Sequence, residues 1–68
     1  MKFGYGKLRG RIIEMFGTQG KFASFMNVSE ATVSKKLKGK VQFDQEDIIT
    51  WCEALDIPIA ESGEYFFA

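Results

Sequence analysis

Apolar side chains recur every three or four positions in the first quarter of the chain, which is the spacing of one buried helix face. They are Tyr5, Leu8, Ile12, Met15 and Phe16. This pattern predicts a helix over Tyr5–Phe16, and Gly17 is suited to end it in the left-handed conformation that helix ends favour. Lys7, Arg9 and Arg11 lie off the apolar face.

Two shorter helices with a tight corner between them are predicted next, over Gln19–Met26 and Glu30–Lys38. Thr18 and Ser29 stand just before them and can accept hydrogen bonds from the free backbone N–H groups of each first turn. Asn27 fits the corner because it tolerates the left-handed backbone that such a turn needs. The residues expected to face the core from these two helices are Phe22, Ala23, Met26, Val33 and Leu37.

A fourth helix is predicted over Gln45–Leu55, where Asp44 caps the first turn and Asp47 completes an acidic variant of the capping box. Its apolar face consists of Ile48, Trp51, Cys52 and Leu55. A final short helical turn is expected over Pro58–Ser62. Together these elements predict an all-α fold, a compact domain of four to five helices that spans residues 1–68.

With 68 residues the chain is long enough for one domain and no more. It contains a single cysteine, Cys52, and no histidine, so an internal disulfide, histidine-based zinc sites and Ser/His or Cys/His catalysis are excluded. Because no nucleophile–base pair, metal-ligand spacing or cofactor motif is visible, we expect neither an enzyme nor a bound metal or cofactor. No signal peptide or long apolar run is present, so we expect a cytoplasmic protein without membrane contact.

Charge is divided between two parts of the chain, although the net charge is zero. Residues 1–40 hold all nine basic residues and two acids, which gives +7, and residues 41–68 hold seven acids and no base, which gives −7. Lysines cluster at the end of the third predicted helix, at Lys35, Lys36, Lys38 and Lys40. Helix C-termini favour cations, which explains part of this cluster. The remainder predicts a basic face, the alternative being a chance segregation of charge on a solvated surface.

The segment from about residue 18 to residue 40 resembles the helix-turn-helix of Cro/repressor-type regulators, also called the XRE or lambda-repressor-like class. The matching positions are Gln19, Ala23, Val28, Val33, Gly39 and Lys40. With KLRGRIIE before this segment and YFF near the C-terminus, the whole chain is similar to small phage-encoded Cro-like regulators of Gram-positive bacteria. Two positions depart from the family pattern. Asn27 stands where the family most often has Gly, and Lys36 stands where it often has a buried apolar residue.

The resemblance implies a sequence-specific transcriptional regulator that binds a double-stranded DNA operator, a phage or prophage repressor of the Cro kind in a bacterial host cell. The second helix of the motif would enter the major groove. The side chains expected to meet base edges are Ser29, Glu30, Ala31, Thr32, Ser34 and Lys35. Those expected at the DNA backbone are Thr18, Gln19, Lys36, Lys38, Lys40, Arg9 and Lys7. For Arg9 and Lys7, a solvated helix face is the alternative.

The aromatic tail, residues 63–68, contains Tyr65, Phe66 and Phe67. These rings either fold back on the first and fourth helices or contact a second copy of the chain. We expect a mixed role, in which the tail lies at or near a homodimer contact, because a small reader of DNA gains a second half-site by dimerising. The acidic half, residues 41–68, supports another hypothesis: a protein-interaction module of the same fold that modulates a repressor or another phage or host protein.

Overall fold

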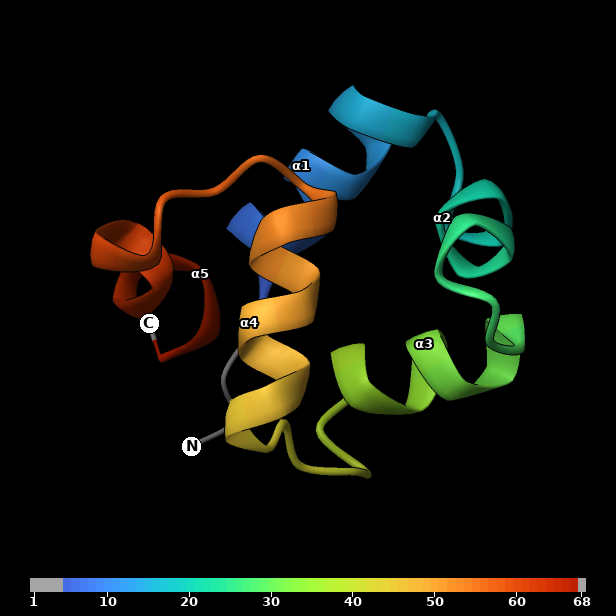
Figure 1. The fold of residues 1–68 in the computed structure, drawn as a ribbon. Coiled ribbons are helices and arrows are strands. Elements are labelled where there is room, and N and C mark those ends of the chain that lie inside the picture. Colours follow the sequence, from blue (N-terminus) through green and yellow to red (C-terminus); the bar gives the residue numbers. More distant parts are fainter. Residues whose placement is uncertain (1–4, 68) are drawn as a thin grey trace.

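The computed structural model of the protein describes residues 5–67, which form five α-helices and one 3₁₀ turn and contain no strand (Figure 1). In chain order they are α1 (Gly6–Phe16), α2 (Gln19–Met26), α3 (Glu30–Leu37), α4 (Gln45–Ala54), the 3₁₀ turn η1 (Ile59–Glu61) and α5 (Ser62–Phe66). The all-α prediction is confirmed, and each of the four longer helices lies within one residue of its predicted bounds. Residues 1–4 of the predicted domain and residue 68 of the predicted tail lie outside the described residues.

Side-chain caps fix the starts of α2, α3 and α4, as the sequence predicts. Thr18 Oγ1 and Ser29 Oγ each accept from the backbone N–H three residues later, both at 3.1 Å. Asp44 and Asp47 form a complete capping box, in which each side chain accepts from the backbone of the other. Caps of this kind stabilise a helix by about 1 kcal/mol each. The helix starts therefore follow from residues that are close in sequence.

Left-handed residues end α1 and α2: Gly17 has φ 87° and Asn27 has φ 61°. Asn27 turns the chain back so that the N–H of Val28 reaches the carbonyl oxygen of Ala23 at 3.0 Å. This bond satisfies a carbonyl group that the end of a helix leaves free. As a result only three residues separate α2 from α3, and the two helices pack against each other.

Every α-helix contributes to one hydrophobic core. The ring of Trp51 lies within it, with its centroid 4.8 Å from those of both Phe22 and Phe43. Phe43 in turn lies 5.0 Å from Phe66 of α5. Edge-to-face pairs such as these add about 1 kcal/mol each beyond the area they bury. The buried apolar residues are Leu8, Ile12, Phe22, Ala23, Val33, Leu37, Trp51, Cys52, Leu55, Ile57 and Phe66.

One sequence prediction about the buried helix faces is wrong. Met15 does not face the core but is 43% exposed, because Phe16 covers the core edge at the end of α1. The short helical turn predicted over Pro58–Ser62 is present as η1, and it leads directly into α5, which packs against α1 and α4. Phe66 of the predicted tail is thus part of the folded core.

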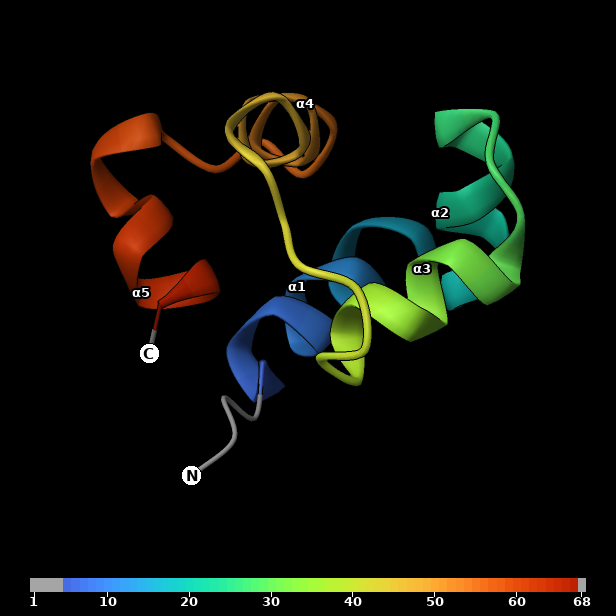
Figure 2. The same cartoon turned by 90° about the horizontal axis from the view of Figure 1, so that it is seen from below.

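The helices are arranged so that α3 lies at one edge of the molecule. Figures 1 and 2 show α1 and α4 standing between α5 on one side and α2 with α3 on the other. Val33 and Leu37 are buried on the inner side of α3, and the opposite side of the helix faces outward.

Candidate nucleic-acid interface

The six side chains that the sequence assigns to base edges lie on α3 or at its N-cap, and none of them is fully buried. Four of them are exposed and two are half-buried. The exposed ones are Ser29, Glu30, Ala31 and Lys35, and the half-buried ones are Thr32 and Ser34. Most are short, so a flat or convex surface can approach the backbone of α3 closely. The predicted base-facing residues are thus accessible, but they do not all point the same way, since successive residues of a helix point about 100° apart.

The hydroxyl groups at the start of α3 are already engaged with each other. Ser29 Oγ and Thr32 Oγ1 are 2.8 Å apart, and Ser29 Oγ also accepts from the backbone N–H of Thr32. A hydroxyl group has one proton and two lone pairs, so each can still make a further contact. The pair is held in a defined orientation by the helix cap.

Glu30 turns toward the start of α2. A Cβ atom placed on Gly20 would lie 3.5 Å from Glu30 Oε1 and 3.8 Å from Thr18 Oγ1. A carboxylate in this position is favoured by the partial positive charge of a helix N-terminus. Glu30 therefore lies near Thr18, one of the two residues predicted to hold a DNA phosphate at this helix start.

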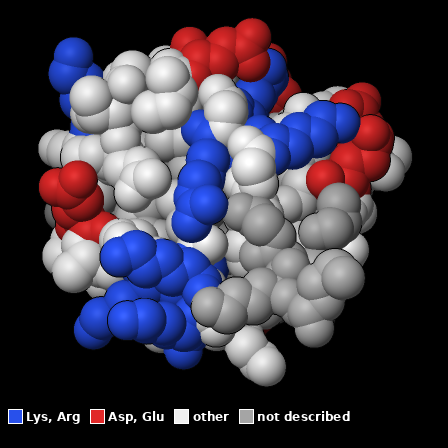
Figure 3. All heavy atoms as spheres, turned by 180° about the vertical axis from the view of Figure 1, so that it is seen from behind, with Lys and Arg blue, Asp and Glu red and all other residues white. Residues whose placement is uncertain are grey.

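Exposed lysines surround the end of α3. Lys35, Lys38 and Lys40 are exposed, and Figure 3 shows basic side chains gathered over this end of the helix, at the lower left of that view. The chain turns at Gly39, which has φ 78°, and the N–H of Lys40 bonds to the carbonyl oxygen of Lys35 at 2.9 Å. The closed turn keeps the lysines on one small area.

Lys36, which the sequence assigns to the DNA backbone, is instead paired with an acid within the folded chain and does not belong to this basic area. Its ammonium group forms an ion pair with Asp47 of α4, with Nζ 2.5 Å from Oδ2. The two side chains are only 12% and 27% exposed. Lys36 follows Lys35 by one residue, so it points about 100° further around the helix, toward α4. The charge of Lys36 is thus neutralised by a partner within the protein.

The environment of Asp47 changes its acidity. Burial alone would raise the pKa of this carboxyl group, but the hydrogen bonds from Lys36 and from the Asp44 backbone, together with the charge of Lys36, lower the pKa below its ordinary value. Asp47 is therefore ionised over the whole neutral range.

The arginines of α1 bind the ends of other helices. Arg9 Nη2 donates to the carbonyl oxygen of Leu37 at 3.0 Å, and Arg11 donates to those of Leu55 and Asp56 at 2.8 and 3.0 Å. Cations stabilise the negative ends of helix dipoles in this way. Arg9, which the sequence assigns to DNA phosphate with a solvated helix face as the alternative, therefore contacts the end of α3 within the fold. Sequence reasoning left this open, since no local pattern shows which helix end an arginine reaches.

The side chain of Lys7 contacts α5. Its Nζ atom lies 2.8 Å from Glu64 Oε1 and 4.9 Å from the centre of the Tyr65 ring. The hydrogen bond to Glu64 raises the pKa of Lys7 despite the small opposing effect of desolvation. Lys7 thus serves a contact between α1 and α5 and is not part of the basic area at the end of α3.

The three tail aromatics have different environments. Phe66 is 2% exposed and Phe67 is 62% exposed, while Tyr65 is half-buried beside Lys7. Phe66 cannot serve as a dimer contact because its ring is enclosed in the core of its own chain. Phe67 is the member of the set whose ring is open to a second molecule.

A shallow groove that the sequence does not predict lies between α2 and α4. Its volume is about 380 Å³, and its lining residues are Phe25, Met26, Thr50, Glu53 and Ala54. Phe25 is 65% exposed, although its ring also touches that of Phe16 with the centroids 5.1 Å apart. Helical periodicity places Phe25 only at the flank of the buried face, which is why its exposure could not be read from the sequence.

Compared with known protein families, residues 1–68 match the family described as "Protein of unknown function (DUF739)". The chain belongs to the DUF739 family. No curated protein matches it. The family description names no activity, so the surfaces of this DUF739 protein are the evidence on which a function can be proposed.

The described part of this DUF739 protein offers little for metal or nucleophilic chemistry. Within residues 5–67, no three His, Cys, Asp or Glu side chains come together as metal ligands would. Cys52 is buried, and burial raises the pKa of its thiol, so the nucleophilic thiolate form is disfavoured at neutral pH. In the same residues, no helix has the length and apolar character needed to cross a bilayer.

Proposed function

We propose that the protein is a sequence-specific, double-stranded DNA-binding transcriptional regulator of the Cro/repressor helix-turn-helix class. The observation that carries the proposal is the division of α3 into a buried side, with Val33 and Leu37, and an outward side that runs from short polar residues to exposed lysines. A helix of this kind fits the major groove, with its start at base edges and its basic end at phosphate. The resemblance of residues 18–40 to that class agrees with this assignment.

In this proposal α3 is the recognition helix. Lys35 donates to guanine, the methyl group of Ala31 contacts thymine, and Glu30 accepts from cytosine once it turns away from Gly20. Lys38 and Lys40 contact phosphates, and the start of α2, with Thr18 and Gln19, holds another. Arg9, Lys36 and Lys7 are left out of the contact set because they are used within the fold. Binding at an operator represses transcription by excluding polymerase.

Recognition of a two-fold symmetric operator requires two copies of the chain. The proposed homodimer uses Phe67, the exposed ring of the tail. Half-sites would be separated by about one turn of DNA, or 10 base pairs. With Lys38 and Lys40 contributed by each copy, the slope of log K against log salt is expected to be about −4.

Selection of bound sequences from random duplex DNA tests the proposal. We expect enrichment of one motif at low salt, with inverted half-sites if the protein binds as a dimer. Lys35→Ala is expected to remove the preference at one base position. Absence of any enrichment at about 50 mM salt, where electrostatic binding is strong, contradicts the proposal.

The groove between α2 and α4 favours a second candidate function, a protein-interaction module. Phe25 is exposed at its edge, and its one charged lining residue, Glu53, forms no ion pair within residues 5–67. A groove of five residues is much smaller than the roughly 800 Å² per partner of a stable protein interface, so it suits a short peptide segment. Because Glu53 is negatively charged, we expect the bound peptide to carry a lysine or arginine next to an apolar residue.

Display selection with random 12-residue peptides tests this candidate. Enriched peptides should combine an apolar residue with a lysine or arginine, and the Glu53→Lys variant should lose them. Enrichment of acidic peptides, or enrichment that is equal on the variant, contradicts it.

A further inference from the structure

Polar side-chain contacts connect the end of α3 to α1 and to α4. The helix packs mainly against α2, through the side that carries Val33 and Leu37. Beyond that packing, Arg9 of α1 donates to the carbonyl oxygen of Leu37, and Lys36 pairs with Asp47 of α4. The second contact joins the proposed recognition helix to the first turn of another helix.

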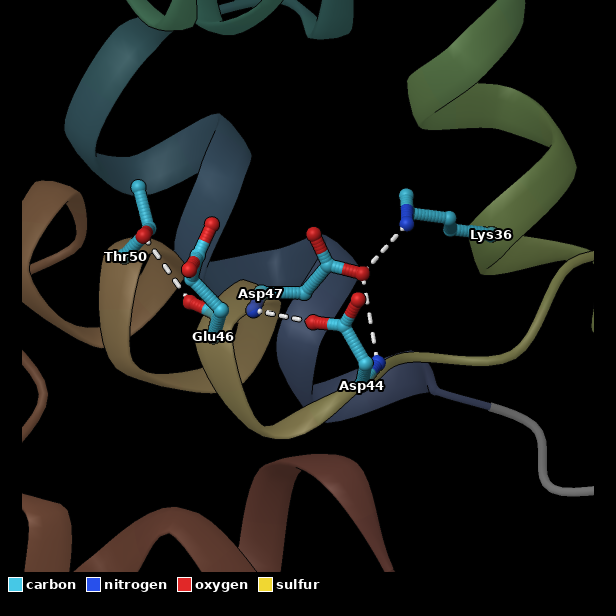
Figure 4. Close-up of polar contacts among 5 residues, drawn as sticks. All are labelled: Lys36, Asp44, Glu46, Asp47 and Thr50. Atoms are coloured by element: carbon cyan, nitrogen blue, oxygen red, sulfur yellow. Dashed lines mark hydrogen bonds and ion pairs between the residues drawn. The ribbon is translucent and has the colours of Figure 1, made fainter.

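The capping box of α4 holds the carboxylate of Asp47 independently of Lys36. Figure 4 shows its carboxylate between the two partners: Oδ2 accepts from the backbone N–H of Asp44 at 3.2 Å and from Lys36 Nζ at 2.5 Å. The backbone N–H of Asp47 in turn donates to Asp44 Oδ1 at 2.7 Å. The capping box of α4 therefore fixes the carboxylate, and the carboxylate fixes the lysine of α3.

We propose that Asp47 is a positioning residue for DNA binding, which through Lys36 sets the angle at which α3 presents its outward face. This inference rests on the proposed function. Asp47 contacts no DNA in this scheme, and Lys36 contributes its charge to the fold and not to phosphate binding.

The geometry explains why such a contact matters. With a rise of 1.5 Å per residue, α3 is about 12 Å long, so a tilt of about 10° around its start moves its last turn by roughly 2 Å. Hydrogen bonds to base edges and phosphates tolerate only a few tenths of an ångström. The Lys36–Asp47 pair acts on the last turn, where the displacement would be largest, and its low exposure protects it from screening by salt.

The competing interpretation is that Lys36 leaves Asp47 and binds a phosphate in the complex. The two interpretations predict opposite effects of Asp47→Asn. If Lys36 binds phosphate, the variant frees the lysine, and DNA binding becomes tighter with a steeper salt dependence. If Asp47 positions α3, the same variant loosens the last turn, and DNA binding becomes weaker.

The experiment measures affinity for the selected duplex over a range of salt concentrations. We expect Asp47→Asn and Lys36→Met each to weaken binding by about 10-fold, because recognition groups have to be held within about 0.5 Å. The double variant should be no weaker than either single variant, since both remove one contact. The salt slope should stay at the wild-type value, and Lys36→Arg should restore most of the affinity.

Glu46→Gln is the matched control for Asp47→Asn. It removes the same charge from the same turn of α4. Within residues 5–67 the Glu46 side chain forms no hydrogen bond or ion pair, and the Thr50 hydroxyl group bonds to the backbone oxygen of Glu46. This control should leave affinity unchanged or slightly raised. Lys36→Met leaves the capping box of α4 intact, so it keeps the test valid if Asp47→Asn does not fold.

Two results overturn the inference. A salt slope that falls by about 1 per copy in Lys36→Met would show that the lysine binds phosphate. Tighter binding by Asp47→Asn than by Glu46→Gln would show that Asp47 competes for Lys36. If the wild-type protein itself binds no duplex, the proposed function fails and this inference fails with it, so the two failures are distinguished by the wild-type measurement.

Discussion

Arg9 of α1 donates a hydrogen bond to the carbonyl oxygen of Leu37, the last residue of α3, across 28 positions of sequence and a distance of 3.0 Å. The contact is partly buried and places a positive charge at the negative end of a helix. A residue that looks like part of a nucleic-acid surface thus stabilises the fold.

Replacing Arg9 with methionine should lower the free energy of unfolding by about 1–2 kcal/mol, because a charge-assisted hydrogen bond is lost and a carbonyl group is left without a partner. Urea denaturation followed by circular dichroism measures this change. Lys21→Met is the control: Lys21 is exposed on α2, and its loss should change stability by less than about 0.5 kcal/mol. Equal effects of the two substitutions would contradict a structural role for Arg9.

Phe66→Ala and Phe67→Ala should separate the two roles of the tail. Removal of the enclosed Phe66 ring should destabilise the chain by about 3–5 kcal/mol, as for other large core residues. Phe67→Ala should leave the stability of the single chain nearly unchanged and weaken self-association. Denaturation curves and sedimentation velocity, run on the same samples, measure the two quantities. A dimer that is unaffected by Phe67→Ala would place the contact elsewhere.

The acidity of Asp47 predicts how stability depends on pH. Its folded-state pKa lies below the ordinary value of 3.8, so the unfolded chain takes up a proton first as pH falls. The stabilisation from the ionised carboxylate is therefore present above about pH 4 and is lost as pH falls through the folded-state value. Denaturation midpoints measured from pH 7 to pH 2.5 should drop less steeply for Asp47→Asn than for the wild type. Parallel curves would show that the carboxylate contributes nothing.

Exposed lysines at the end of α3 and lysines paired within the fold should differ in their effect on DNA binding. Lys38→Ala should reduce the magnitude of the salt slope by about 0.9 for each copy bound, because one phosphate contact is lost. Lys7→Ala removes the same charge from a lysine that is paired with Glu64, and it should leave the slope unchanged. Fluorescence anisotropy at four or more salt concentrations gives both slopes. A smaller salt slope for Lys7→Ala would show that Lys7 does contact DNA phosphate.

Features that depend on neighbouring residues could be predicted from the sequence. The caps at Thr18, Ser29 and Asp44 and the left-handed corner at Asn27 follow from local hydrogen bonding, and the structure contains all of them. The buried faces of the helices also follow from their spacing, apart from Met15.

Features that depend on distant residues could not be predicted in the same way. Lys36, Arg9 and Lys7 are all basic residues on helix surfaces, and only the packing of the helices decides that each meets a partner at least 11 positions away. Phe66 is similar, since its burial depends on how α5 returns to α1 and α4. The sequence therefore predicted the buried side of α3, and it did not show that Lys36, Arg9 and Lys7 have partners within the fold.

The enclosed position of Trp51 has a practical consequence. It is the only tryptophan of the chain, is 4% exposed, and lies against Phe22 and Phe43 in the core. Its emission will therefore change when the chain unfolds and will be insensitive to events at the outer surface of α3. The protein carries an intrinsic fluorophore that reports conformational integrity in the same cuvette in which a labelled oligonucleotide reports complex formation.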